Sequence, residues 1–107
     1  MVDFLEHAEI GKNQSKKTIE NYNHYLGRFV KWFGEKKSAK DITLETVQSF
    51  RLYLNRLTDE KGRQLLSVKT QNYHVIALRA FLKYCIKNDI QTLAPEKIDL
   101  HKKLFYV

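Results

Sequence analysis

Apolar residues recur at spacings of three and four along three long stretches of this chain, and this pattern constrains its fold more than any other feature. Such spacing places the side chains on one side of an α-helix, because a helix turns by about 100° per residue. Glycine occurs four times and proline once, at Pro95, so little interrupts these stretches. The chain of 107 residues is therefore expected to form one all-α domain with a single core.

The spacing predicts a compact bundle of four to five helices. Helices are expected over 3–9 with Asp3 as its cap, over 15–35, over 43–57 and over 67–88, and a short last helix is expected from Pro95. The helix over 67–88 is apolar around more than half of its circumference, which predicts a central position. The polar residues at 11–14 and 58–66 predict loops, and a hairpin of two short strands is an alternative for the second loop.

The balance of charge indicates an anionic partner. The formal net charge is +7 and the pI is near 9.5, which is typical of proteins that bind nucleic acid or an acidic membrane surface. The longest apolar run, at 75–78, is too short to span a membrane, and the N-terminus lacks a secretory signal. We therefore expect a cytoplasmic protein without a membrane partner.

The residues that catalysis or metal binding would need do not occur in a suitable pattern. The lone cysteine, Cys85, excludes an internal disulfide. The four histidines lack the spacing of metal ligands, and there is neither a glycine-rich phosphate loop nor a nucleophile paired with a base. No catalytic residue, no metal site and no cofactor is therefore expected.

Two of the expected helices begin with nearly the same residues, Ser15-Lys16-Lys17-Thr18 and, 52 positions later, Ser67-Val68-Lys69-Thr70. Acids are favoured at a helix N-terminus because its free N–H groups carry a partial positive charge, and the other helices supply Glu6, Glu45 and Glu96. Lysine there is unfavourable unless an anion occupies the site. Free N–H groups, a hydroxyl and an ammonium together bind phosphate well. The alternative is that these are ordinary caps whose lysines point into water.

The polar sides of the same two helices extend these openings. One side of the helix over 67–88 carries Lys69, Asn72, Arg79, Lys83 and Lys87, and one side of the helix over 15–35 carries Lys17, His24, Arg28 and Lys31. A solvated face is the alternative for both. The residues predicted to contact DNA are Ser15, Lys16, Lys17, Thr18, Asn21, Ser67, Lys69, Thr70, Gln71, His74, Arg79 and Lys83.

An ordered set of motifs resembles the core-binding, SAM-like N-terminal domain of tyrosine recombinases and phage integrases. The motifs are Ser15-x-x-Thr18-x-x-x-Tyr22-x-x-x-Leu26-x-x-Phe29, Asp41-Ile42-Thr43, Ser67-x-Lys69-Thr70, Ala77-Leu78-Arg79-x-Phe81-x-x-Tyr84 and Leu93-Ala94-Pro95. The resemblance implies a helical domain that covers one face of duplex DNA, contacts it with two helices, and forms a C-shaped clamp with a separate catalytic domain.

The resemblance also implies a division of the chain and a set of partners. Residues 1–100 would form the core-binding domain, and 101–107 a truncated linker toward the absent catalytic domain. The family's catalytic Arg, Lys, His and Tyr belong to that other domain, so this fragment is not expected to be an enzyme. The expected partners are double-stranded DNA, the C-terminal catalytic domain and other protomers of the recombinase.

Two other classes of protein remain as alternatives. A helical protein–protein interaction module would use its positive charge for solubility and would show no salt-sensitive affinity for DNA. A stand-alone DNA-binding regulator would need a short turn before a polar recognition helix, and the helix over 67–88 is too apolar to suit that role.

Overall fold

The computed structural model describes residues 2–10 and 15–100. Its elements are α1 (Val2–Ile10), α2 (Lys16–Phe33), the 3₁₀ turn η1 (Ala39–Asp41), α3 (Leu44–Arg56), α4 (Val68–Lys87) and the 3₁₀ turn η2 (Pro95–Lys97). No strand occurs within these two ranges, so the prediction of an all-α bundle is confirmed. The predicted loop at 11–14 and the predicted linker at 101–107 lie outside the described residues.

The three long helices begin where the sequence predicts. Ser15, Thr43 and Ser67 have extended backbones, and each side chain accepts a hydrogen bond from the backbone N–H three residues later. Gly34 ends α2 with φ at +114°, a backbone that favours glycine. At the end of α4, the Ile90 N–H donates to the Cys85 carbonyl at 2.8 Å, which closes the last turn in a Schellman motif.

Two predictions about short elements need correction, and a third short element was not predicted. Asp3 lies in the first turn of α1 and does not cap it, because α1 already begins at Val2, and Asp3 rather than Glu6 is the acid of that turn. The η1 turn was not predicted; the Asp41 carboxylate stabilises it by accepting from the Ser38 backbone N–H at 2.9 Å. The short last helix is a single 3₁₀ turn that begins at Pro95, as expected, but ends at Lys97.

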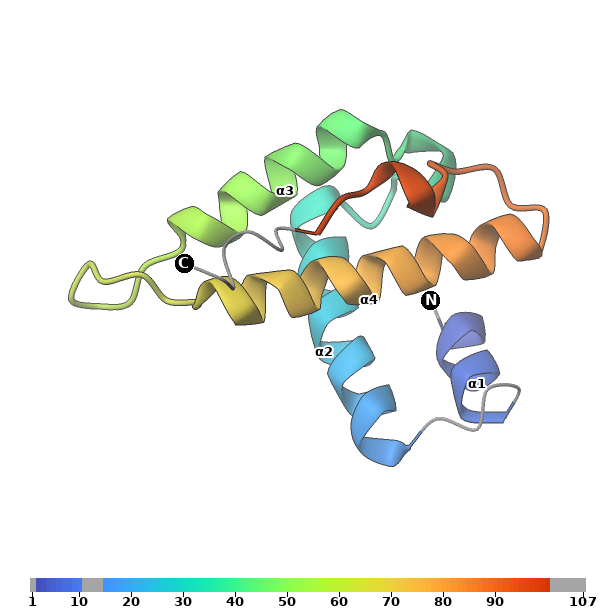
Figure 1. Cartoon of the computed structure of the whole chain (residues 1–107), viewed down its shortest axis with the longest axis horizontal. Helices are drawn as coiled ribbons and strands as arrows, with labels where there is room; N and C mark the ends of the chain where they lie inside the picture. The colour runs from blue at the N-terminus through green and yellow to red at the C-terminus, as the bar shows by residue number, and fades with distance from the viewer. Residues whose placement is uncertain (1, 11–14, 101–107) are drawn as a thin grey trace.

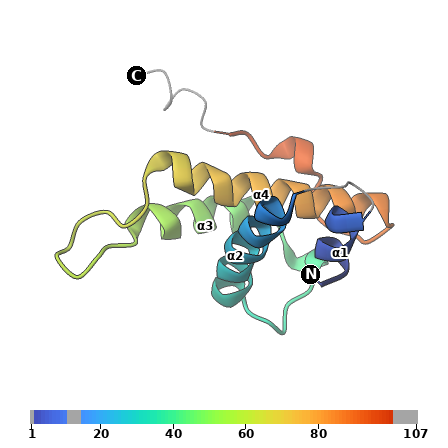
Figure 2. The ribbon, with the colours of Figure 1, turned by 90° about the horizontal axis from the view of Figure 1, so that it is seen from below.

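The central position predicted for α4 is confirmed. It packs against α2, α3 and η2, while α1 packs against α2. Figures 1 and 2 together show that α2 crosses α4 and that α2 and η2 lie on opposite sides of it. The core draws on every helix, and its buried members are Phe4, Leu26, Phe29, Ile42, Val47, Phe50, Leu54, Val75, Ala77, Leu78, Leu82 and Ile98.

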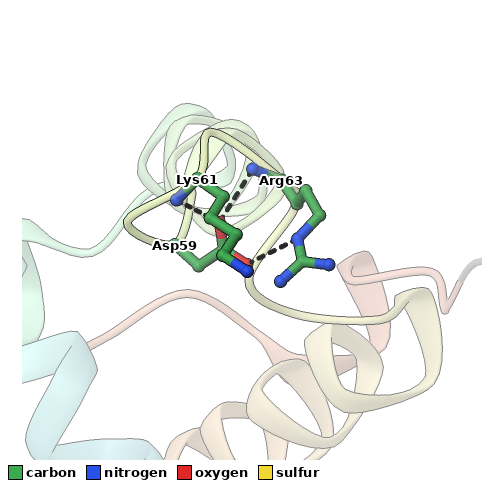
Figure 3. A network of polar contacts seen from close by, with 3 residues as sticks. All are labelled: Asp59, Lys61 and Arg63. Atoms are coloured by element: carbon green, nitrogen blue, oxygen red, sulfur yellow. Dashed lines mark hydrogen bonds and ion pairs between the residues drawn. The ribbon is translucent and has the colours of Figure 1, made fainter.

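The loop between α3 and α4 is an ordered polar hairpin (Figure 3). It contains one antiparallel bridge, between Thr58 and Gln64, in place of the two short strands considered as an alternative. The Asp59 carboxylate accepts from the backbone N–H groups of Lys61 at 2.8 Å and Arg63 at 2.9 Å, and from the Arg63 side chain at 3.2 Å. These hydrogen bonds lower the pKa of Asp59, and the bond from the Arg63 backbone N–H has the largest effect.

Neither a membrane-spanning helix nor a metal site is found within residues 2–10 and 15–100. No helix there combines the length and the apolar character that crossing a membrane requires. The same residues contain no group of three or more His, Cys, Asp or Glu side chains placed to hold a metal ion.

Candidate nucleic-acid interface

The two lysine-bearing helix openings have the same local geometry. The cap residues Ser15 and Ser67 have φ and ψ of −66° and 156°, and −66° and 160°. Each serine Oγ accepts from the N–H of the threonine three residues later, at 3.1 Å for Thr18 and 3.2 Å for Thr70. Each serine hydroxyl also lies against that threonine's hydroxyl, at 2.9 and 3.1 Å. The repeated sequence therefore folds into a repeated structure.

Each opening keeps the features that bind an anion. The serine satisfies one N–H of the first turn, and helix geometry leaves the earlier N–H groups without intrahelical acceptors. Lys16, Lys17 and Lys69 are exposed, and the first turns of α2 and α4 contain no acid, unlike those of α1 and α3. The side chains and N–H groups at each opening can thus approach one phosphate together.

The two openings lie at separate corners of the molecule because α2 and α4 cross (Figure 1). The Tyr25 and Tyr73 rings stack near the crossing, with centroids 6.4 Å apart. Lys17 is about 12 Å along α2 from Tyr25, and Lys69 is about 6 Å along α4 from Tyr73. Each opening therefore lies within about three helical turns of the stacked tyrosine rings.

A mixed aromatic and basic surface joins the openings. Tyr73 is exposed, and the Lys69 ammonium lies 6.0 Å from the centre of its ring. On α2, His24 is exposed beside the half-buried Tyr25, with ring centroids 5.4 Å apart. Asn21 is half-buried on the same helix. Cations beside aromatic rings are a common combination at nucleic-acid interfaces.

One predicted contact residue, His74, lies inside the fold and cannot reach a ligand from there. Its side chain is 1% exposed, between α2 and α4. The Nδ1 atom lies 2.8 Å from the Thr70 carbonyl oxygen, and Nε2 lies 3.1 Å from the Arg28 guanidinium. Burial has the largest effect on the pKa of His74 and lowers it. The hydrogen bond with Thr70 acts in the opposite direction, and the charges of Arg28 and His24 lower the pKa further.

Two other predicted residues are engaged in internal hydrogen bonds. The Gln71 amide donates to the Leu66 carbonyl at 3.0 Å and to the Asn55 side chain at 3.2 Å, which ties the hairpin to α4. Arg79 is half-buried and its Nε donates to the Pro95 carbonyl at 3.4 Å. Both side chains fasten neighbouring segments to α4.

The exposed face of α4 is shifted from the one that the sequence predicts. Asn72 is buried, and Arg79 faces the segment that holds η2. The exposed residues of α4 are Lys69, Tyr73, Ile76, Lys83, Ile86 and Lys87. Lys83 and Lys87 lie beside a cavity of about 250 Å³ between α1, α2 and α4, so the structure places them apart from the α4 opening.

Arg28 lies on the predicted polar side of α2 but is not among the predicted contacts. It is half-buried in the structure, and its guanidinium lies 3.1 Å from His74 of α4, close to where α2 and α4 cross. The signal was present in the helical spacing, because Lys17, His24 and Arg28 fall on one side of α2. Helical spacing does not indicate that His74 is the partner of Arg28, because only the crossing of α2 and α4 brings these two side chains together.

Comparison with known proteins gives two matches to this chain. The family described as phage integrase, N-terminal SAM-like domain, matches residues 1–89. Tyrosine recombinase XerC of Anoxybacillus flavithermus is 29% identical over 92 residues, which are 86% of this chain and 29% of that protein. The chain thus spans less than a third of that relative. No solved structure gives a significant match. Because the family match covers most of the chain, the chain belongs to the family of phage integrase N-terminal SAM-like domains.

Proposed function

We propose that this chain grips one face of duplex DNA within a tyrosine recombinase, holding one phosphate at the N-terminus of α2 and another at that of α4. The observation that carries the proposal is the matched pair of openings. Both place a lysine where the helix dipole disfavours positive charge, and both do so on the same serine cap. A phosphate at each site would turn an unfavourable charge into a favourable one.

The hydrogen bonds at the α4 opening suit a phosphate. The Ser67 hydroxyl donates to Thr70 Oγ1, so the hydrogen of the Thr70 hydroxyl is free to donate elsewhere. The Lys69 ammonium and the first-turn N–H groups are donors as well. A phosphate oxygen accepts such bonds, and charge-assisted ones are the stronger kind.

The distribution of charge supports a polyanionic partner. The α4 helix contains Lys69, Arg79, Lys83 and Lys87 and no acid at all. Within the ranges that the structure describes, the one ion pair joins Arg63 to Asp59 in the hairpin. The lysines of α2 and α4 therefore have no carboxylate at salt-bridge distance there, and they are available to an external anion.

The family membership indicates the kind of protein in which this function would operate. The relative from Anoxybacillus flavithermus is named a tyrosine recombinase, and this chain spans 29% of it. We assign DNA gripping to this chain, and strand cleavage and rejoining to a catalytic domain elsewhere in a longer protein. Its partners would then be duplex DNA, that catalytic domain and further protomers, with residues 1–100 acting as the core-binding domain.

The proposal predicts weak duplex binding that falls steeply with salt. With two phosphate contacts, one at each opening, affinity should drop roughly tenfold between 50 and 200 mM salt. Because the chain would contact only one face, Kd at physiological salt should lie in the non-specific range of about 10⁻⁴–10⁻⁶ M, with little dependence on sequence. Fluorescence anisotropy of a labelled duplex at the two salt concentrations measures both quantities.

The same titration separates this function from its rival. A protein–protein interaction module with a basic surface predicts no measurable duplex binding at 50 mM salt. Binding that is absent there, or that does not weaken as salt rises, would contradict the proposed function.

A further inference from the structure

We propose that the buried His74 is a positioning residue that holds Arg28 as a third phosphate contact, close to where α2 and α4 cross. This inference rests on the proposed function, and it adds to it a residue pair that the openings do not include. It assigns His74 a role through Arg28 in place of the direct contact that the sequence predicts.

The surroundings of Arg28 suit a side chain that binds an anion. It is half-buried on α2, and its Nη1 atom lies 3.1 Å from His74 Nε2. No carboxylate of the described residues lies within salt-bridge distance of it. A guanidinium has five N–H donors, and partial burial of a cation without a counter-ion is unfavourable. The remaining donors suit a phosphate, which arginine can bind with two parallel hydrogen bonds.

The partners of His74 fix which nitrogen carries its proton. The Thr70 carbonyl oxygen can only accept, so Nδ1, at 2.8 Å, carries the hydrogen. A guanidinium can only donate, so Nε2 is the unprotonated acceptor for Arg28. The neutral imidazole therefore satisfies both bonds, whereas an imidazolium would direct an N–H at a cation. Burial favours the neutral ring, since it lowers the pKa of His74.

The packing around His74 leaves its ring little freedom. The Tyr25 ring lies 4.5 Å away and the Phe50 ring 6.4 Å away, measured between centroids. Its Nδ1 partner, Thr70, is also the residue whose N–H and hydroxyl bind Ser67 at the α4 opening. One hydrogen-bonded path thus links the α4 opening to Arg28 on α2. A fixed imidazole holds the guanidinium in place and reduces the entropy lost when it binds a phosphate.

The two residues can be tested by a double-mutant cycle on duplex affinity at pH 7.5 and fixed salt. Arg28→Ala should weaken binding about tenfold and reduce the slope of log affinity against log salt by about one. His74→Phe keeps a ring of similar shape but removes the acceptor, and should weaken binding about threefold to fivefold. In the Arg28→Ala background, His74→Phe should cause no additional loss, because the residue that it positions is gone.

Two further variants control for the fold and for general charge. His74→Gln can place a carbonyl oxygen near the former Nε2 position, and should retain affinity within about twofold of the unaltered chain. Lys31→Ala removes a charge from exposed α2 surface that has no histidine partner, so its effect should be smaller than that of Arg28→Ala and should add to that of His74→Phe. Thermal melts confirm that each variant is folded.

The outcomes separate this inference from the function on which it rests. If His74→Phe costs the same affinity with and without Arg28, then His74 acts only on the fold and the inference is wrong. If Arg28→Ala leaves affinity and salt slope unchanged while changes at Lys17 and Lys69 abolish binding, the inference fails and the proposed function stands. Should His74→Phe not fold, the comparison of Arg28→Ala with Lys31→Ala, and the retention of affinity by His74→Gln, decide it.

Discussion

Changing both Lys17 and Lys69 to glutamate is expected to weaken duplex binding about 100-fold at low salt, or about tenfold per site. Each change removes an attraction to a phosphate and adds a repulsion at the same place. The slope of log affinity against log salt should become shallower by about two. Anisotropy titrations of the unaltered chain and the double mutant, at matched salt, measure both effects.

The same double mutant is expected to be slightly more stable than the unaltered chain. Glutamate suits a helix N-terminus, and removing lysine there relieves an unfavourable interaction of about 0.3–1 kcal/mol per site. Affinity and thermal stability should therefore move in opposite directions. An ordinary surface lysine would give the stability gain without the loss of DNA binding.

A matched control distinguishes the openings from the overall charge. Lys36→Glu combined with Lys40→Glu makes the same change in net charge at exposed positions beyond the C-terminal end of α2. It should lower affinity only modestly, through the general field of the protein. Equal losses in the test pair and the control pair would show that the assignment of the two openings is wrong.

Phe50→Ala is expected to lower the free energy of unfolding by about 3–5 kcal/mol. The Phe50 ring is fully buried, at 0% exposure, and meets rings from α2 and α4 as well as α3. Its centroid distances are 5.0 Å to Phe29, 5.2 Å to Trp32 and 6.4 Å to His74. Removing it leaves a cavity where three helices meet. Since small domains are stable by only about 5–15 kcal/mol, this is a large part of the total.

Leu52→Ala on the same helix provides the control for Phe50→Ala. Leu52 is 51% exposed, so its truncation should change the free energy of unfolding by less than about 0.5 kcal/mol. Urea denaturation of both variants, followed by circular dichroism, compares them directly. Similar midpoints for the two would contradict the packing described for α3.

The long helices and their caps could be predicted from the sequence because their signals are local. Ser15, Thr43 and Ser67 each bond to a group three residues away, so cap chemistry and helical spacing determine them without knowledge of the rest of the fold. The η1 turn has only three residues, too few to give a periodic pattern. The last helix is short for a related reason, since only one turn of 3₁₀ geometry follows Pro95.

The surroundings of the predicted contact residues were harder to predict, because helical spacing does not reveal what covers each side of a helix. His74 and Asn72 were assigned to polar surroundings by their chemistry, but α4 is central and both are buried. Gln71 and Arg79 are polar side chains whose hydrogen bonds go to the hairpin and to the segment around Pro95. The openings were identified correctly as matching structures because a helix N-terminus has the same geometry wherever the helix packs.

The most direct test of the account is to observe which backbone amides respond to duplex DNA. A ¹⁵N-labelled chain titrated with a short duplex should show its largest chemical-shift changes in the first turns of α2 and α4, at residues 16–18 and 68–70, with smaller changes on the surface between them. These changes should diminish together as salt is raised. Changes that are confined to the outer face of α3, or spread evenly over all exposed lysines, would contradict the claim that the two openings hold the DNA.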